Sequence, residues 1–260
     1  MSALRRIPGK GWLALIGGGE FSFEETEQAD AAWLAKRPVG DRSAASEEAL
    51  AADAAVASAD SDAVGFVPAA SGSEDYANHF AIYFDEYFER RVVTLPLYRG
   101  RDARRGKNAE RIDAVGDLYL AGGVADHLLD ALSESPALEA MQRKLEAGGT
   151  VAAIAAAAQS LGVVVKSLFR GKTLPGFGWL PGGIVETNFE KNGASERRLR
   201  KLLEHPRAKW GLGIAASSAV LLGPEGEVEV HGSAWLLTDP NGELGRLETM
   251  PEHLGVANSP

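Results

Sequence analysis

The chain has no cysteine, which excludes disulfides, thiolate metal sites and cysteine nucleophiles and leaves the redox compartment open. It has no apolar run approaching the roughly 20 residues that a transmembrane helix needs. Its start, Met1–Lys10, is positively charged, but no apolar segment of signal-peptide length follows it. These absences predict a cytoplasmic protein with no membrane partner.

A basic excess is also missing. The 27 Lys and Arg residues are outnumbered by 36 Asp and Glu residues, and the net charge is −9. Nucleic-acid binding depends on a basic face, so we expect no nucleic-acid partner. With 260 residues, 45% hydrophobic and 24% charged, the chain has an ordinary globular composition and is long enough for one large α/β domain or two small ones.

The most informative stretch is Gly148–Gly162. A Gly-Gly break precedes a short apolar run, which is typical of a buried strand, and an alanine run follows, which favours a helix. The strand meets the helix with no loop residues between them. In many hydrolytic α/β enzymes such a junction presents the nucleophile at the top of the sheet. Here no Ser, Cys or Thr occurs from Val151 to Ala158.

Three other segments combine a strand with a tight turn. Trp12–Ile16 runs into three glycines and Glu20, Val64–Pro68 precedes Ser71, and Asp117–Leu120 leads to Gly122 and Gly123. Glycine turns let a ligand or a loop approach the backbone closely. The first turn lacks the spacing of a dinucleotide-binding fingerprint. Ser71 or Ser73 can cap the helix that follows the second strand.

The helical segments vary in how clearly they are marked. Between Phe23 and Asp62 we expect a helix at Glu47–Ala57, with the remainder in loops and the acidic face solvated. A second helix is expected from Glu74 to about Arg91. Its aromatic residues recur at steps of three and four, which favours core packing over a ligand platform.

The segment Arg99–Arg111 is locally basic. Six cations less two anions give it a charge of +4 in an acidic protein: Arg99, Arg101, Arg104, Arg105, Lys107 and Arg111 against Asp102 and Glu110. The simpler interpretation is an exposed loop and helix start. The alternative is a site for an acidic partner or phosphate.

The stretch Gly148–Ala158 resembles the nucleophile elbow of the cyanophycinase and dipeptidase E-like serine peptidases, which reads approximately G-G-x-I-x-G-T-S-A-G-A. In this alignment the family serine falls on Ala155, the threonine before it on Ile154, and the later glycine on Ala157. The glycine turns after the expected strands Trp12–Ile16 and Asp117–Leu120 resemble the same family. A methyl group cannot attack a carbonyl, so the resemblance implies the family scaffold without its reactive atom.

The other family residues that carry chemistry are replaced as well. The segment D-Q-H-F, which supplies the family histidine, falls on Glu186–Phe189, so that the histidine becomes Asn188 and the aspartate Glu186. The family pair Asp-Gln after the Gly-Gly turn falls on Val124 and Ala125. No Asp, Glu or His occurs from Ala156 to Val185, where the family places its acid. A family G-R-L motif leaves Arg197 or Arg198 for a structural or anion-binding role.

The resemblance implies a three-layer α/β sandwich with a mostly parallel central sheet, of the flavodoxin-like or class I glutamine amidotransferase-like kind. It covers residues 12–238 of a single expected domain, 1–260, with a loosely held tail from 251. Val228–Val230 and Ala234–Leu237 are expected to form two short strands around a turn, closing an antiparallel edge. Ligands should bind at the carboxyl ends of the parallel strands. A homodimer is a further expectation from the resemblance.

Two functional hypotheses follow. The first is a noncatalytic binding or regulatory protein, or a remnant, without cofactor or metal, whose partner is an unknown small molecule or protein. Its shallow, mostly apolar pocket would be lined by Gly18, Gly19, Glu20, Ser71, Gly122, Gly123, Ala155, Ala156, Glu186, Asn188 and Arg197. The second is a hydrolase of small peptides or amides that uses other residues, with Ser71 and Glu186 as the main candidates, beside Glu20, Gln159 and Ser160.

Other classes have less support in the sequence. A glutamine amidotransferase would need a cysteine at the elbow, and a metal enzyme would need ligand spacing that the chain does not show. The five histidines do not flank a plausible nucleophile: His79, His127, His205, His231 and His253.

Overall fold

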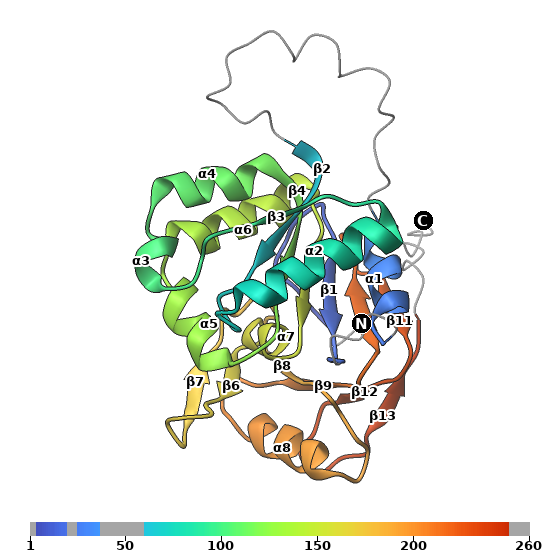
Figure 1. Ribbon diagram of the computed structural model, residues 1–260. Coiled ribbons are helices and arrows are strands. Elements are labelled where there is room, and N and C mark those ends of the chain that lie inside the picture. Colours follow the sequence, from blue (N-terminus) through green and yellow to red (C-terminus); the bar gives the residue numbers. More distant parts are fainter. Residues whose placement is uncertain (1–3, 20–24, 37–59, 250–260) are drawn as a thin grey trace, which may run out of the picture.

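The computed structural model describes residues 4–19, 25–36 and 60–249 (Figure 1). Its helices are α1 Glu27–Leu34, α2 Glu74–Phe88, α3 Gly100–Ala103, α4 Gly106–Ala114, α5 Ala125–Leu132, α6 Pro136–Ala147, α7 Ala156–Ser160 and α8 Ala194–Leu203. Its strands are β1 Leu13–Ile16, β2 Asp60–Val67, β3 Val92–Thr94, β4 Val115–Leu120, β5 Val151–Ile154, β6 Val164–Lys166, β7 Thr173–Pro175, β8 Gly183–Glu186, β9 Trp210–Ile214, β10 Ala219–Leu222, β11 Val228–His231, β12 Ala234–Leu237 and β13 Gly245–Leu247. Within these ranges no helix has the length and apolarity to cross a bilayer.

The main sheet has seven strands in the order β11-β10-β1-β5-β4-β2-β3. The five from β1 to β3 in this order are parallel, and β10 and β11 add an antiparallel edge. The sequence prediction of a mostly parallel sheet with an antiparallel edge near the C-terminus is therefore confirmed. The central strands β1, β4 and β5 are buried along their whole length, as expected for a parallel sheet covered on both faces.

Helices cover both faces of this sheet, which gives the three layers visible in Figure 1. Side chains alternate along a strand, so successive residues of β1 face opposite layers. Leu13 and Leu15 pack with α4, α5 and α6 in the larger core. Ala14 and Ile16 pack with α1 and α2 in the second core.

The second core is rich in aromatic rings. Phe66 of β2, Tyr119 of β4 and Phe80 and Phe84 of α2 pack together, and the ring centroids of this last pair lie 4.1 Å apart. Contacts of this kind stabilise a core beyond the area they bury. The prediction that the aromatic residues of α2 form core is confirmed for this group, whereas Tyr87 on the same helix is 52% exposed.

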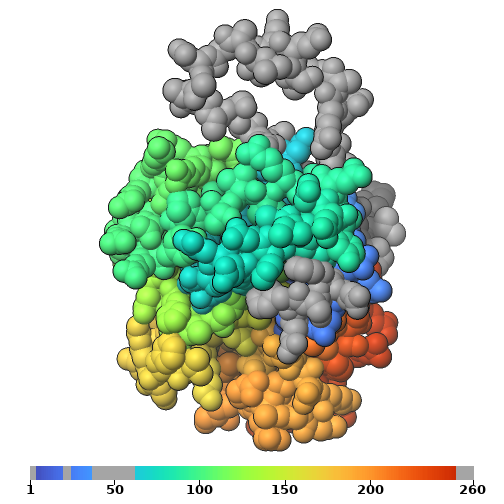
Figure 2. All heavy atoms as spheres, viewed as in Figure 1, coloured from blue at the N-terminus to red at the C-terminus, as the bar shows by residue number. Residues whose placement is uncertain are grey.

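A second sheet has four strands in the order β13-β12-β9-β8, and α8 packs against it (Figure 1). The larger core extends from the main sheet into this one through Val185 and Leu212. The expected pairing of Val228–Val230 with Ala234–Leu237 is wrong, because β11 pairs with β10 in the main sheet and β12 pairs with β9 in the second. The space-filling view shows α2 to α4 above the hairpin β6–β7 and α8 on one face (Figure 2).

Three further details correct the sequence predictions. The helix α1 occupies a region expected to be loop, because Ala29 and Trp33 of that helix are buried against the sheet. Strand β2 begins at Asp60, where a loop was expected, and pairs there with Val115. Helix α2 ends at Phe88 rather than near Arg91. The helix expected at 47–57 and the tail from 251 lie outside the described residues.

Candidate functional site

The parallel strands bring the predicted site residues to one edge of the main sheet. Ile16 pairs with Ile154 at the ends of β1 and β5, and Leu120 at the end of β4 pairs with Val67 at the end of β2. The turns that follow these strands therefore meet at the carboxyl edge, where ligands bind in open α/β sheets. The structure thus groups three of the expected loops, those after β1, β4 and β5, with the loop that holds Ser71.

Ala155 forms the bend between β5 and α7. Its φ of 51° and ψ of −118° lie outside the regions that an alanine prefers. Its amide donates to the Ile16 carbonyl oxygen at 2.9 Å, and its own carbonyl accepts from Gln159 at 3.0 Å. This is the sharp strand-to-helix turn of a nucleophile elbow, held by hydrogen bonds on both sides. A strained conformation of this kind costs about 1–3 kcal/mol and is typical of functional sites.

The turn after β4 lies beside this bend. A Cβ atom placed on Gly122 would be 3.4 Å from the Ala155 Cβ. Gly123 has a φ of 141°, and a Cβ there would come within 2.4 Å of the Ala70 carbonyl oxygen. Close packing therefore requires a glycine at position 123, whereas a Cβ on Gly122 would make only ordinary contacts. Burial raises the pKa of the Tyr76 phenol well above its usual value, and a backbone contact with Gly122 opposes this rise.

The hydroxyl groups of Ser71 and Ser160 form hydrogen bonds with neighbours in their own segments. The Ser71 hydroxyl donates to the Pro68 carbonyl oxygen at 3.2 Å and accepts from the Ser73 amide at 3.3 Å. Ser160 is fully buried, and its hydroxyl donates to the Ala156 carbonyl oxygen at 2.8 Å. Ser160 therefore points into packing, as expected. The loop of Ser71 borders Gly123, but its hydroxyl is not paired with an imidazole.

Asn188 lies across the glycine turn after β1. Its backbone N–H donates to the Gly17 carbonyl oxygen at 2.7 Å. A Cβ on Gly18 would be 2.5 Å from the Oδ1 atom of the Asn188 side chain. Two further bonds join the same turn to the loop after β9: Ser217 donates to the Gly18 carbonyl at 2.7 Å, and Gly17 donates to the Ser218 carbonyl at 2.8 Å. The Asn188 side chain is exposed, so its carboxamide can contact a ligand at this edge.

Glu186 and Arg197 do not join the site. Glu186 is 3% exposed, and its Oε1 accepts from Arg198 at Nε (2.7 Å) and at Nη2 (2.6 Å). Burial raises the pKa of the Glu186 carboxyl, and the Arg198 guanidinium opposes this effect. Its neighbour Val185 faces the core shared with Ala157, so Glu186 faces the opposite side of β8. Arg197 is exposed on α8, and of the two arginines it is Arg198 that has the structural role.

The histidines are scattered over the described structure. His79 and His127 are exposed on α2 and α5, and His205 accepts from the Arg207 amide at 3.2 Å. His231 is level with Ile16 in the register but lies three strands from β5, which is about 14 Å at the usual strand spacing. Within 4–19, 25–36 and 60–249, no three His, Asp or Glu side chains gather as a possible metal site. Two further candidates, Glu20 and His253, lie outside these ranges.

Sequence reasoning missed a buried carboxylate close to the same edge. Asp30 of α1 is 1% exposed and accepts from Trp33 Nε1 at 3.0 Å and from the Tyr83 hydroxyl at 3.2 Å. Burial raises the pKa of Asp30 to about 6, while hydrogen bonds from Trp33, Thr26 and Tyr83 oppose that rise. Thr26 in turn lies next to Gly19. The sequence signal that could have indicated this burial was Trp33, a large apolar residue three positions after Asp30. The segment was interpreted as a solvated acidic face instead.

The strain at Ala155 gives a test of the bend. Ala155→Gly is expected to raise the free energy of unfolding by about 1 kcal/mol, because glycine tolerates this conformation and the relief exceeds its entropy cost. The control Ala157→Gly, two residues on in α7, is expected to lower it by about 1 kcal/mol or more. Urea unfolding followed by circular dichroism measures both. Equal losses in the two variants would contradict a strained bend.

The comparisons with known proteins agree with this geometry. No protein-family model matches the chain, and no curated protein matches it significantly. A crystal structure of a peptidase from an acI-B1 Actinobacterium superposes with a TM-score of 0.65 at 20% identity, covering 93% of this chain and 96% of the peptidase. A peptidase E candidate from Listeria monocytogenes EGD-e gives a TM-score of 0.58 at 12% identity, covering 85% and 98%. The chain therefore has a peptidase-like α/β fold.

Proposed function

We propose that this chain is a noncatalytic binding or regulatory protein built on the scaffold of the cyanophycinase and dipeptidase E-like peptidases. The observation that carries the proposal is Ala155: the bend has the strained backbone of a nucleophile elbow, and its side chain is a methyl group. The fold shared with the two peptidase structures supports the scaffold. The residues at the bend support the loss of chemistry.

Hydrolysis at such a bend needs an attacking group, a base and a group that orients the base. Position 188 aligns with the family histidine, and the exposed Asn188 carboxamide there does not titrate near neutral pH. The aligned acid position, Glu186, is paired with Arg198 on the other side of its strand.

The same edge retains groups that can hold a ligand without cleaving it. The Asn188 carboxamide offers both donors and an acceptor beside Gly18. The turn after β4 leaves backbone accessible to a bound molecule at Gly123, which is exposed. These groups suit an amide or short peptide that is held by hydrogen bonds. We therefore assign the edge to binding rather than turnover.

Restoring the nucleophile alone is not expected to restore activity. Ala155→Ser should neither hydrolyse β-aspartyl or N-terminal aspartyl dipeptides nor react with a fluorophosphonate probe, because position 188, which aligns with the family base, holds an amide that cannot take up the hydroxyl proton. Intact-protein mass spectrometry and dipeptide turnover measure this. Adding Asn188→His to the serine variant serves as the comparison, since it supplies an imidazole at the aligned position.

Two results would contradict the proposal. One is fluorophosphonate labelling at position 155 in the Ala155→Ser variant without the added histidine. The other is dipeptide turnover by the unmodified chain that disappears in Ser71→Ala, which would make the protein a hydrolase with a different nucleophile. A Ser160→Ala variant is a poor control because that hydroxyl is fully buried, whereas Ser73→Ala changes a hydroxyl in the same loop.

A further inference from the structure

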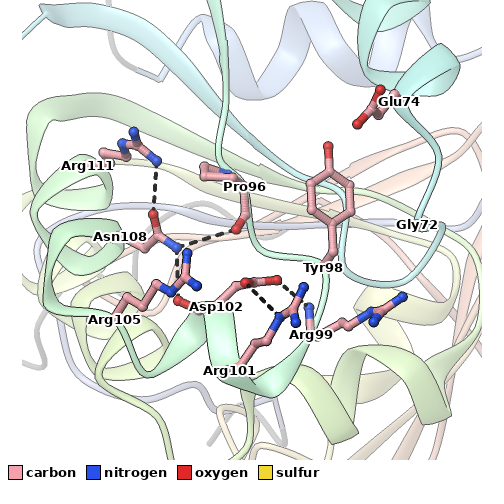
Figure 3. Close-up of a pocket in the computed structure, with 10 residues that line it drawn as sticks. All are labelled: Gly72, Glu74, Pro96, Tyr98, Arg99, Arg101, Asp102, Arg105, Asn108 and Arg111. Carbon is pink, nitrogen blue, oxygen red and sulfur yellow. Dashed lines mark hydrogen bonds and ion pairs between the residues drawn. The ribbon is translucent and has the colours of Figure 1, made fainter.

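A basic hollow lies on the surface, and Ala155 is not among the residues that line it. It has a volume of about 540 Å³ and is walled by the turn before α2, the segment after β3, and helices α3 and α4 (Figure 3). The residues that give it its character are Arg99, Arg101, Arg105, Arg111, Tyr98 and Asn108. A volume of this size is within the range of small-molecule sites.

The cations of the hollow are largely uncompensated. Four arginines line it against two carboxylates, Glu74 and Asp102, so its lining has a charge of +2 in a chain of −9. Asp102 is already used, since its Oδ2 accepts from the Arg99 amide at 3.1 Å and its Oδ1 lies 3.6 Å from the exposed Arg101 Nε. Among the residues that the structure describes, no carboxylate pairs with the guanidinium groups of Arg99, Arg105 or Arg111.

The floor of the hollow is fixed by a buried amide. Asn108 is 5% exposed and donates to the Asp102 carbonyl oxygen at 2.9 Å and to the Pro96 carbonyl oxygen at 3.4 Å. Its Oδ1 accepts from Arg111 Nη1 at 3.0 Å, so that guanidinium is held at the wall before any ligand arrives. Preorganised donors cost less entropy to engage than free ones. Figure 3 shows Asn108 between Arg111 and the α3 turn.

The opposite wall has a different chemistry. Tyr98 is half-buried, and Figure 3 shows its ring between Glu74 on one side and Arg99 and Arg101 on the other. The Glu74 carboxylate can accept hydrogen bonds from hydroxyl groups but repels anions. A ligand that satisfies both walls carries its negative charge at one end and a ring or hydroxyl groups at the other.

We propose that this hollow binds a small organic phosphate. Guanidinium groups match phosphate oxygens in geometry and charge, and the three terminal oxygens of a phosphate ester can engage several of them at once. The ring or sugar part of the ligand lies against Tyr98 and Glu74. Nucleic acid is a poorer fit because the chain is acidic as a whole and the basic residues form one bounded hollow. The inference does not depend on whether the bend at Ala155 is catalytic.

The test uses isothermal titration calorimetry of the full chain with adenosine 5′-phosphate and ribose 5-phosphate, at constant ionic strength. At least one of the two is expected to bind with a dissociation constant below about 1 mM. Adenosine and succinate, which lack the phosphate, should bind at least tenfold more weakly. Arg99→Ala with Arg105→Ala should weaken phosphate binding at least tenfold, because two charge-assisted donors are lost.

The matched control is Arg104→Ala with Lys107→Ala. It removes the same charge from the same segment, and neither residue lines the hollow. Its dissociation constant should stay within twofold of the unmodified chain, and circular dichroism checks that both double variants are folded. Three results would overturn the proposal: no binding of either phosphate at 5 mM, equal weakening in the two double variants, or adenosine or succinate binding as tightly as the phosphates.

Discussion

Replacing Gly17 by alanine is expected to lower the free energy of unfolding by about 3 kcal/mol or more. A Cβ at this position would lie 2.0 Å from the Ala215 carbonyl oxygen and 2.7 Å from that of Ile214. Both obstacles are backbone atoms, so no side-chain rotation can relieve the clash. Gly17 also donates to Ser218 and accepts from Asn188, so moving it disturbs both bonds.

Gly106→Ala is the control for this variant. Gly106 begins α4, and no atom lies within 4 Å of a Cβ placed there. Alanine is therefore expected to stabilise the helix by up to about 1 kcal/mol. Urea unfolding of both variants beside the unmodified chain measures the effects. A Gly17→Ala chain whose stability falls by less than about 1 kcal/mol would show that the turn can yield.

Replacing Asp30 by asparagine is expected to change how stability depends on pH. Burial raises the pKa of Asp30 from 3.8 to about 6, so the folded state holds this proton more tightly than the unfolded state. The resulting stabilisation is fully present below pH 3.8 and is lost as the pH rises through about 6. The gap between the two pKa values corresponds to about 3 kcal/mol. The gain in stability from Asp30→Asn should therefore be about 3 kcal/mol larger at pH 8 than at pH 3.5.

The measurement is the difference between two urea titrations at each pH, because other titrating groups cancel in it. Tyr83→Phe is the control: it removes a donor to Asp30 but leaves the carboxyl able to titrate. Its stability difference from an Asp30→Asn, Tyr83→Phe double variant should depend on pH in the same direction and at least as strongly, because the lost hydrogen bond opposed the rise in the pKa of Asp30. A difference that stays constant from pH 3.5 to pH 8 would mean that Asp30 does not titrate differently on folding.

The parts of the fold that follow local rules could be predicted from the sequence. The apolar run Val151–Ile154 and the glycines around it specified a buried strand and a tight junction, and the structure has both. The glycine pair after β4 indicated close backbone packing, which the structure shows at Gly123, where a Cβ would come within 2.4 Å of the Ala70 carbonyl oxygen. Such residues carry this information because a glycine marks a position where the backbone must turn or pack without a Cβ, and an apolar run marks a buried strand.

The parts that depend on distant pairing could not be predicted. Two short apolar strands near the C-terminus look like a hairpin locally, yet β11 and β12 belong to different sheets because their partners β10 and β9 do. Asp30 looked like part of a solvated face because its donors Tyr83 and Thr26 come from other segments or from the helix boundary. Glu186 was expected at the site because it aligns with the family aspartate. The direction of a strand side chain depends on register, however, and this carboxylate pairs with Arg198 instead.

The hydrogen bonds that join Gly17 and Gly18 to Ser217, Ser218 and Asn188 have a mechanical consequence. They tie the turn after the first strand of the large sheet to loops of the small sheet, so neither sheet can rotate as a rigid body without breaking all three. Hinge closure, common in proteins that grip their ligands between two lobes, is therefore blocked along this seam. A molecule that binds near the bend therefore contacts a surface that is already in its final conformation.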